Sequence, residues 1–309
     1  MSSNGDSGGA ELRIICGPTG AGKSALALDL AERHGLTILV ADSRQVYRGF
    51  DIGTAKPTRL ESARVPHEGI DLIDPAERYS AAAWAAHAEA VIRRLGASRV
   101  AIVGGTGLYV RALVRPLFHE PPLEPERRAA LAAELDALDT ATLKRWVEQL
   151  DPSRASLGRT QLLRALEVAL LTGRRISDLH RDAAREAHWR ARWLVVDPRE
   201  QLLPRIERRL DEMLAVGWLD EVRTLAAQVP AEAPAWKACG YHALRAYTQG
   251  ADTLDIARAA ILVATRQYAK RQRTWFRHQL RDEAVTQLDP RDARAADVTD
   301  RWWLGGGST

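Results

Sequence analysis

Residues 17–24 read Gly-Pro-Thr-Gly-Ala-Gly-Lys-Ser and follow the pattern G-x-x-x-x-G-K-[ST] of a Walker A phosphate-binding loop. An apolar run over 12–16 precedes the loop and is typical of a buried strand, while 24–34 has apolar residues at helical spacing and ends before Gly35. Backbone N–H groups and the helix N-terminus of such a loop surround a phosphate, its lysine reaches the outer phosphate, and its serine can bind Mg²⁺. The flanking elements favour this interpretation over a chance glycine-rich turn and predict a polyphosphate or pyrophosphate site. Its residues are Gly17, Pro18, Thr19, Gly20, Ala21, Gly22, Lys23 and Ser24, with Ser24 as the Mg²⁺ ligand.

The composition is that of an ordinary soluble globular protein, with 46% hydrophobic and 27% charged residues in a chain of 309. The formal charge is only +4, but 44 Lys and Arg residues direct attention to an anionic partner. Cys16 and Cys239 have no metal-ligand spacing and indicate no disulfide framework. No apolar run approaches the ~20 residues of a membrane span. We therefore expect a cytoplasmic monomer without membrane association.

Strand and helix patterns alternate along residues 11–115, the first part of the expected core. Strands are expected at 12–16, 37–41 and 99–103, and a capped helix at 80–95. Such alternation predicts an α/β fold with a parallel sheet and helices on both faces. Because ligands gather at the carboxyl ends of parallel strands, the loops 17–24, 42–47 and 104–107 are expected to meet there.

The pattern changes after Arg115, and the rest of the chain divides into further parts. Residues 116–190 predict an all-α insertion, and 191–290 the second part of the core, which begins with a strand at 191–197. We expect residues 1–10 to be a disordered leader and 291–309 a mobile tail. Helices are expected at 125–138, 140–150, 159–172, 199–216, 218–228 and 253–279, and a last strand at 284–288.

The predicted helix at 253–279 carries four cations, Arg266, Lys270, Arg273 and Arg277, at spacings that put them on one face. Aromatic residues interleave with this charge, and Ile256 begins an apolar stripe in the first half of the helix. Cations beside aromatic rings suit an RNA backbone and an unstacked base. The alternative is a solvated helix face, which is the usual fate of a run of charges.

Several segments together resemble the bacterial tRNA dimethylallyltransferase (tRNA isopentenyltransferase) family, in the same order along 13–289. DSRQVY, then IGTAKP, then GGTGLY is the most specific part of this resemblance, because a Walker loop alone is shared by many enzymes. The segments are GPTGAGKSALALDLA, ADSRQVYRGFDIGTAKPT, IVGGTGLYVRAL, RALEVALLTGR, RIERRLDEMLAVGWLDEV, KACGYHAL and ATRQYAKRQRTWF.

The resemblance implies a P-loop-kinase-like core with a helical insertion that helps to hold the anticodon stem of tRNA. It implies transfer of a dimethylallyl group from dimethylallyl diphosphate to the N6 amine of the adenine 3′ of the anticodon, in tRNAs that read codons beginning with U. Diphosphate is released, and Mg²⁺ is the implied cofactor. The implied partners are therefore the tRNA anticodon stem-loop and dimethylallyl diphosphate.

By the same resemblance, Asp42 matches the general base that accepts the amine proton, and Thr106 donates a hydrogen bond toward the bridging oxygen of the leaving group. Aspartate is ionised at neutral pH and needs no unusual tuning for this role. The alternatives for Asp42 are an outer partner of Mg²⁺ or a helix cap. For Thr106 the alternative is a simple turn residue.

Further positions carry over from the family with less specific roles. Arg209 is the expected pyrophosphate clamp, although Arg205 and Arg208 are open alternatives, as is a structural ion pair. Leu162 stands where many members have an arginine, and Arg159 is a candidate replacement. The implied tRNA contacts, besides Asp42 and the basic helix, are Ser43, Arg44, Gln45, Gln161, Arg164, Lys237, Cys239, Gly240 and Tyr241.

Three other functions use parts of the same pattern. A nucleotide or small-metabolite kinase would place ATP on the loop and close an arginine-rich lid over it. An adenylate isopentenyltransferase would prenylate free AMP, but a mononucleotide needs neither an insertion nor a basic helix. A non-catalytic RNA-binding module would not need an intact Walker loop beside Asp42 and Thr106.

Overall fold

The structure is a computed structural model that describes residues 11–115, 124–183 and 189–305. Two compact units are distinguished: a sheet unit, Met1–Val114 with Trp189–Thr309, and a helical unit, Arg115–His188. The expected leader at 1–10 lies outside the described residues. No described helix has the length and apolar character needed to cross a membrane.

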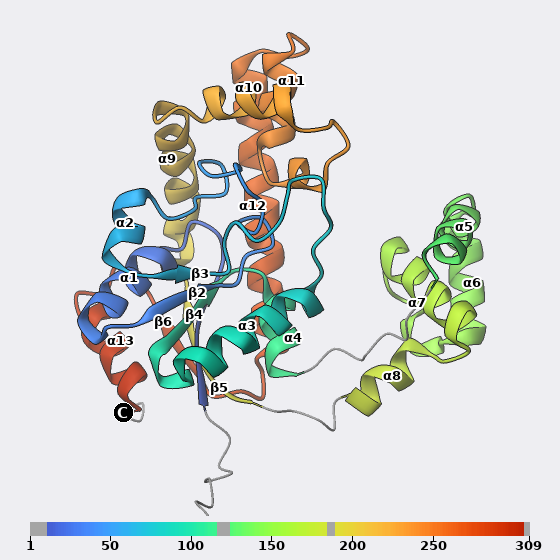
Figure 1. The fold of residues 1–309 in the computed structure, drawn as a ribbon, viewed down its shortest axis with the longest axis horizontal. Helices are drawn as coiled ribbons and strands as arrows, with labels where there is room; N and C mark the ends of the chain where they lie inside the picture. Colours follow the sequence, from blue (N-terminus) through green and yellow to red (C-terminus); the bar gives the residue numbers. More distant parts are fainter. Residues whose placement is uncertain (1–10, 116–123, 184–188, 306–309) are drawn as a thin grey trace, which may run out of the picture. The chain divides into compact units, whose positions relative to one another are not determined.

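The sheet unit contains six parallel strands in the order β3-β2-β4-β1-β5-β6 (Figure 1). The central strands read as continuous apolar runs because both faces of a parallel sheet are covered by helices. The predicted α/β fold with a P-loop-kinase-like core is confirmed. The strands are β1 Glu11–Cys16, β2 Thr37–Val40, β3 His67–Glu68, β4 Val100–Gly104, β5 Arg190–Val196 and β6 Val285–Leu288.

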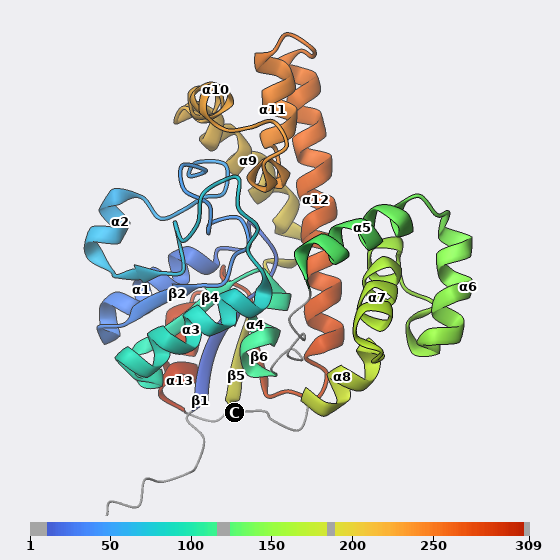
Figure 2. The same ribbon diagram turned by 45° about the vertical axis from the view of Figure 1, so that its right-hand side comes forward.

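Helices cover the two faces of the sheet (Figures 1 and 2). α1 and α13 share a buried apolar cluster with alternate residues of the strands, while α3 and α4 pack together on the opposite face. On that face the buried Trp84 of α3 stacks on Tyr109 of α4 with 5.2 Å between ring centroids, and its indole N–H donates to Val40 O at the end of β2. The helices that flank the sheet are α1 Lys23–His34, α2 Arg59–Arg64, α3 Ala81–Leu95, α4 Gly107–Val114 and α13 Ala295–Leu304.

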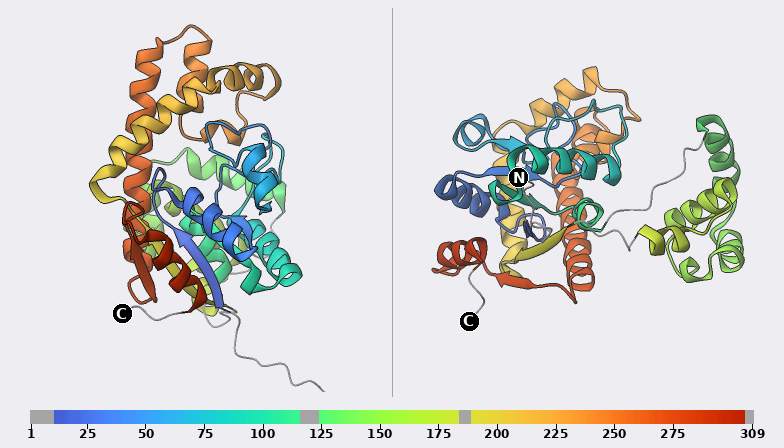
Figure 3. Two further views of the ribbon diagram at one scale, coloured as in Figure 1. Left: turned by 90° about the vertical axis from the view of Figure 1, so that its left-hand side faces the viewer. Right: turned by 60° about the horizontal axis from the view of Figure 1, so that its bottom comes forward.

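A second group of helices rises beyond the carboxyl ends of the strands and joins the sheet through the long helix α12 (Figure 3). α12 packs against α9 and α11, and α10 lies against both of those helices. The carboxyl ends of the strands therefore face this second group of helices. The sequence predicts the ligand site at these strand ends. The helices of this group are α9 Leu202–Ala215, α10 Trp218–Gln228, α11 Tyr241–Thr248 and α12 Leu254–Gln279.

The helical unit is built from four helices, and no strand occurs within residues 124–183. Leu162 is buried in its apolar core, so the position that differs from the family pattern is filled by a packing residue. Arg159 donates to Leu138 O and Asp136 O, each at 2.7 Å, and thereby holds the end of the first helix. The helices are α5 Pro125–Asp136, α6 Thr140–Leu150, α7 Arg159–Thr172 and α8 Ile176–Ala183.

The prediction of a mobile tail over 291–309 is wrong for the described part of this segment. Residues 295–304 form α13, whose side chains Trp302 and Trp303 are almost fully buried against α1 and the sheet. The Arg13 guanidinium lies 4.9 Å from the centre of a Trp303 ring and donates to the Trp303 carbonyl. Two adjacent tryptophans supply enough apolar surface to dock a short terminal helix.

Replacing Trp303 with alanine is expected to lower the free energy of unfolding by about 3–5 kcal/mol, because it removes a large buried side chain and leaves a cavity. Leu304→Ala is the matched control, since Leu304 is 70% exposed and its loss should change stability by less than about 0.5 kcal/mol. Urea unfolding followed by circular dichroism measures both. Equal effects of the two substitutions would contradict the docking of α13.

Candidate active site

The phosphate-binding loop joins β1 to α1 and is held from several sides. Lys23 begins α1, and its ammonium group donates to Pro18 O at 2.8 Å, so the side chain folds back over the loop. Gly22 precedes the helix in a left-handed conformation. The loop residues predicted from the sequence therefore form one compact turn at the carboxyl end of a central strand.

Lys23 lies in a desolvated and electropositive environment. Burial is the main cause that lowers its pKa, to about 8, and the nearby Arg209 guanidinium adds to the effect. Asp42 acts in the opposite sense on both cations. Burial also lowers the pKa of Arg209. Two half-buried, desolvated cations that share Asp42 as a nearby carboxylate form a site that favours a further anion.

The structure separates the three arginines of α9 that the sequence left open. Arg209 donates to Thr19 Oγ1 at 3.2 Å, and Arg205 donates to Gly20 O at 3.0 Å, so both lie against the phosphate-binding loop. Arg208 is exposed and lies 3.8 Å from the Glu212 carboxylate. Arg209 and Arg205 are thus both positioned to contact a phosphate, whereas Arg208 is not.

Gln272 of α12 is a site residue that sequence analysis missed. Its side chain accepts a hydrogen bond from Thr19 N and donates one to Gly105 O, both at 2.8 Å. It is buried and joins the first and third predicted loops. No local signal marks it, because a glutamine within a basic helix reads as a surface residue.

Asp42 follows β2 in a tight turn. One of its carboxylate oxygens accepts hydrogen bonds from Arg44 N at 2.8 Å and Gln45 N at 3.4 Å, so it closes a turn rather than capping a helix, since no helix begins there. The Thr106 hydroxyl accepts a hydrogen bond from Ser43 N at 3.0 Å. Asp42 and Thr106 are therefore brought together across β2 and β4.

Tyr268 of α12 completes this polar group and was also missed from the sequence as a site residue. Its hydroxyl is hydrogen-bonded to the Thr106 side chain, and burial together with the Asp42 charge raises the pKa of Tyr268 to about 12. A neutral phenol thus lies beside the carboxylate and the threonine hydroxyl. The three groups come from two strand ends and one helix.

A cavity lies between these polar groups and the helices α9, α10 and α12. Its apolar wall consists mainly of α9, the first residue of α10 and the middle of α12, while Asp42, Thr19 and Arg209 contribute polar groups. Lys23 and Thr106 are not among the lining residues. The remaining lining residues are Arg44, Gly53, Thr54, Ile206, Leu210, Met213, Trp218, Ala238, Cys239, Ile261, Thr265 and Tyr268.

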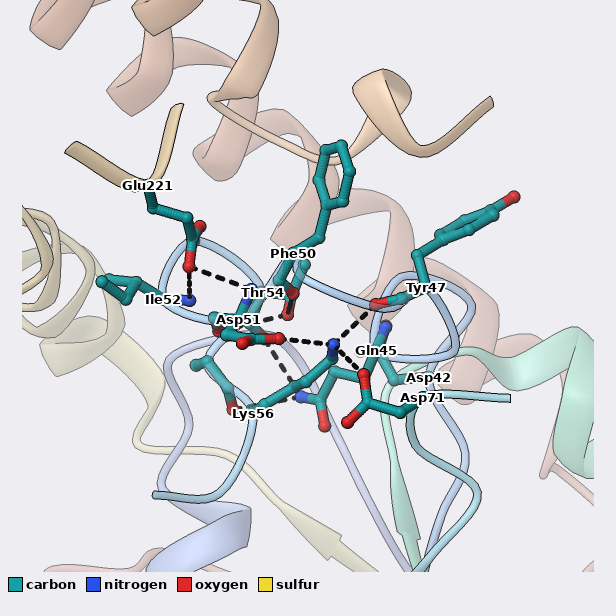
Figure 4. A network of polar contacts seen from close by, with 12 residues as sticks. Asp42, Gln45, Tyr47, Phe50, Asp51, Ile52, Thr54, Lys56, Asp71 and Glu221 are labelled. Atoms are coloured by element: carbon teal, nitrogen blue, oxygen red, sulfur yellow. Dashed lines mark hydrogen bonds and ion pairs between the residues drawn. The ribbon is translucent and has the colours of Figure 1, made fainter. Parts of the chain in front are cut away.

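The loop at 50–56, which contains the first five residues of the IGTAKP motif, is fixed against the Asp42 turn (Figure 4). Lys56 is almost fully buried and donates to Tyr47 O and Asp51 at 2.6 Å and to Asp71 at 2.5 Å. The Gln45 amide donates to Thr54 O at 3.0 Å. Gln45 was predicted to contact tRNA, but its amide holds this loop.

The residues of the Cys-Gly-Tyr segment, which the sequence assigned to tRNA contacts, differ in where they lie. Tyr241 is fully buried, and its hydroxyl donates to Glu221 at 2.5 Å and accepts from Gly53 N at 3.1 Å. A side chain without exposed surface does not reach RNA, so the predicted contact of Tyr241 is corrected to a structural role. Cys239 lines the cavity, and Lys237 is exposed.

The four cations of α12 divide into two pairs. Arg266 is ion-paired with Glu207, and Arg273 with Asp197 at 2.5 Å, so these two fix α12 to its neighbours. Lys270 and Arg277 are exposed, and no ion pair engages either of them within the described chain. The predicted apolar stripe does not face the core, because Ile256 is 54% exposed.

Gln161 and Arg164 belong to the helical unit. Gln161 accepts a hydrogen bond from Gly158 N at 3.0 Å and closes the start of α7. Arg164 donates to Glu167 at 2.7 Å on the same helix. Within their own unit, both side chains are engaged in stabilising α7.

The Ser24 side chain lies exposed in the first turn of α1, next to Lys23. Across residues 11–115, 124–183 and 189–305 no three His, Cys, Asp or Glu side chains gather as a metal site. One hydroxyl without a cage of carboxylates matches the way Mg²⁺ is bound through substrate phosphates. The residues present therefore fit a metal ion that arrives with a diphosphate.

Comparison with known proteins gives a consistent result. The family described as IPP transferase matches residues 45–279, and the one described as isopentenyl transferase matches residues 10–66. A tRNA dimethylallyltransferase of Geobacter metallireducens is 44% identical over 277 residues, covering 86% of this chain and 89% of the relative. One from Deinococcus radiodurans is 41% identical over 297 residues, covering 93% and 96%.

Solved structures agree with the sequence relatives. A tRNA isopentenylpyrophosphate transferase of Bacillus halodurans is 30% identical, with a TM-score of 0.66 over 96% of this chain and 97% of that one. A eukaryotic dimethylallyltransferase acting on tRNA is 22% identical, with a TM-score of 0.78 over 94% and 77%, and shares the fold. The chain belongs to the tRNA dimethylallyltransferase family of prenyl-transferring enzymes.

Proposed function

We propose that this protein transfers a dimethylallyl group from dimethylallyl diphosphate to the N6 amine of the adenine 3′ of the anticodon in tRNAs that read codons beginning with U. The observation that carries the proposal is the single cavity in which a phosphate-binding loop and the Asp42 carboxylate both take part. The new bond joins N6 to the allylic carbon. The carbon–oxygen bond breaks, and diphosphate leaves with the electron pair.

Negative charge builds on the leaving diphosphate, so cations and N–H groups around it lower the barrier. The positive charge comes from Lys23, Arg205 and Arg209. It acts more strongly in this desolvated site than it would in water. Lys23 exchanges its bond to Pro18 O for a phosphate oxygen. Mg²⁺ held by Ser24 and the diphosphate supplies further charge neutralisation when bound.

The amine proton leaves as the new bond forms, and Asp42 is the carboxylate that accepts it. The oxygen that caps the turn keeps Asp42 oriented, which leaves the second oxygen for this role. Thr106 is held by Ser43 N and Tyr268, and we assign to its hydroxyl the hydrogen bond to the bridging oxygen.

The acceptor adenine leaves the anticodon-loop stack to reach Asp42, at an unstacking cost of a few kcal/mol. Arg44 and Cys239 line the cavity, and Lys237, Lys270 and Arg277 offer exposed positive charge. We assign backbone contacts with the anticodon stem-loop to these cations and, in the helical unit, to the face that carries Arg164.

Two alternatives use the same cavity, a kinase and an isopentenyltransferase acting on free AMP. A kinase has no need for an apolar wall of Ile206, Leu210 and Met213 beside the phosphate site. Free AMP has no need for the exposed cations of α12. Incubation with ATP and with AMP in place of the two proposed substrates separates the three reactions.

Asp42→Asn is expected to lower the single-turnover rate of prenyl transfer by about 10²-fold or more while tRNA affinity stays within about twofold. Asparagine retains the side-chain oxygen that caps Arg44 N, so the turn is preserved and only the proton acceptor is lost. Rapid quench with labelled dimethylallyl diphosphate gives the rate, and filter binding gives the affinity. A near-normal rate in this variant would show that Asp42 is not the base.

Diphosphate affinity is expected to fall as the pH rises through about 8, because the Lys23 ammonium must be protonated to bind an anion and its pKa is lowered to about 8. Below that pH the lysine contribution is fully present, and above it the loss approaches roughly tenfold per pH unit. Calorimetric titration with inorganic pyrophosphate measures the profile. Lys23→Arg is the control, since a guanidinium stays charged and should remove the step near pH 8.

Lys270→Ala and Arg277→Ala are each expected to reduce the slope of log K for tRNA binding against log salt by about 1. Arg258→Ala on the same helix removes the same charge from an ion pair with Asp211, so its slope should stay unchanged. Filter binding between 50 and 200 mM salt, roughly the range over which such contacts weaken strongly, measures the slopes. If all three substitutions lowered the slope equally, the effect would come from the net charge of the protein and not from contacts of Lys270 and Arg277 with RNA phosphates.

A further inference from the structure

Trp218, the first residue of α10, lines the cavity but has no role in the reaction steps described above. It is 2% exposed, and its indole N–H has no hydrogen-bond partner within the described chain. A buried N–H without a hydrogen-bond partner lowers the stability of the fold. The way the indole ring packs gives a reason for a tryptophan at this position.

Two glycines leave room for the Trp218 ring. A Cβ atom at Gly53 would lie 2.2 Å from Trp218 Cε2, and one at Gly240 would lie 2.3 Å from Trp218 Cη2. Gly53 belongs to the IGTAKP motif and Gly240 to the Cys-Gly-Tyr segment. Both motifs therefore approach the indole more closely than any larger residue allows.

The loop that presses on Trp218 is itself locked (Figure 4). Glu221 accepts hydrogen bonds from Asp51 N at 3.1 Å and Ile52 N at 2.7 Å, while the next N–H, that of Gly53, donates to the Tyr241 hydroxyl. Three successive N–H groups are thus held by one carboxylate–phenol pair. Tyr241 also packs edge-on against Trp218 with 5.4 Å between ring centroids. The indole is thus held by Gly53, Gly240 and Tyr241 on the sides that do not face the cavity.

Trp218 lies at the far end of an apolar path that starts at the phosphate-binding loop. Ile206, Leu210 and Met213 occupy one face of α9 and line the cavity over about 10 Å of helix. A Cβ atom at Gly20 of the loop would lie 3.1 Å from Ile206, so the path begins beside the diphosphate position. A chain attached to that diphosphate extends along this face toward the indole.

From this geometry we infer that Trp218 sets the length of the prenyl donor by closing the cavity with a rigid wall. The inference rests on the proposed function, since it concerns the donor of that reaction. A dimethylallyl chain ends before the indole, whereas a geranyl chain, one isoprene unit longer, meets it. Overpacking a rigid wall is costly, so the longer donor is excluded.

The test is a comparison of dimethylallyl and geranyl diphosphates in wild type, Trp218→Phe and Trp218→Ala. Transfer to tRNA is read by mass spectrometry, and donor affinity is measured separately by calorimetry without tRNA. Wild type is expected to prefer dimethylallyl by about 10²-fold or more. The preference should fall at least about tenfold in Trp218→Ala and less in Trp218→Phe.

Trp236→Phe is the matched control, because Trp236 belongs to the same aromatic cluster, in contact with Phe50, but does not line the cavity. It should leave donor preference unchanged. Trp218→Phe keeps an aromatic ring and removes the unpaired N–H, so it provides a folded variant if alanine destabilises α10.

Unchanged donor preference in Trp218→Phe and Trp218→Ala overturns the inference, as does a weaker tRNA affinity with the same donor preference. Donor binding that discriminates by length without any prenyl transfer to tRNA would support the wall and overturn the proposed acceptor. The two ideas therefore fail separately.

Discussion

The site depends on an imbalance of charge. Lys23 and Arg209 lie near each other and are both desolvated, and Asp42 is the carboxylate that acts on both of them. A protein tolerates such an arrangement when a ligand brings the missing negative charge. The phosphate-binding loop, the arginines of α9 and the carboxylate are therefore parts of one electrostatic unit.

α12 keeps this unit together. Its inner face carries Gln272, which bonds both Thr19 and Gly105, and Tyr268, which bonds Thr106. The helix is fixed to the rest of the sheet unit by ion pairs, including that of Arg273 with Asp197. The same helix thus lines the cavity and exposes the cations Lys270 and Arg277.

Sequence patterns predicted the parts of the site that lie in local motifs. The loop 17–24 and the two strand ends at Asp42 and Thr106 converge as expected, because parallel strands bring their carboxyl ends to one edge. Residues that reach the site from distant helices were missed. Tyr268 is one of the aromatic residues that interleave with the cations of this helix, and helix spacing alone does not say which face docks on the loops.

Local sequence patterns do not reveal long-range partners, and this explains the two wrong predictions, for Tyr241 and for the tail at 291–309. Tyr241 lies in a motif associated with RNA, yet its hydroxyl is needed by Gly53 N and Glu221, which are far away in the sequence. Trp302 and Trp303 lie near the end of the chain, but their burial depends on a free surface of α1 and the sheet that no local pattern reveals. In each case a long-range partner decided the outcome.

A rigid loop at 50–56 links the polar and apolar ends of the cavity. Gln45 holds it from the side of Asp42, and Glu221 holds it from the side of Trp218. Both anchors bond backbone atoms, so they fix the course of the loop itself. A carboxylate must be placed to within a fraction of an ångström of its proton to act as a base. The proposed wall at Trp218 and the turn that orients the proposed base Asp42 therefore share one support.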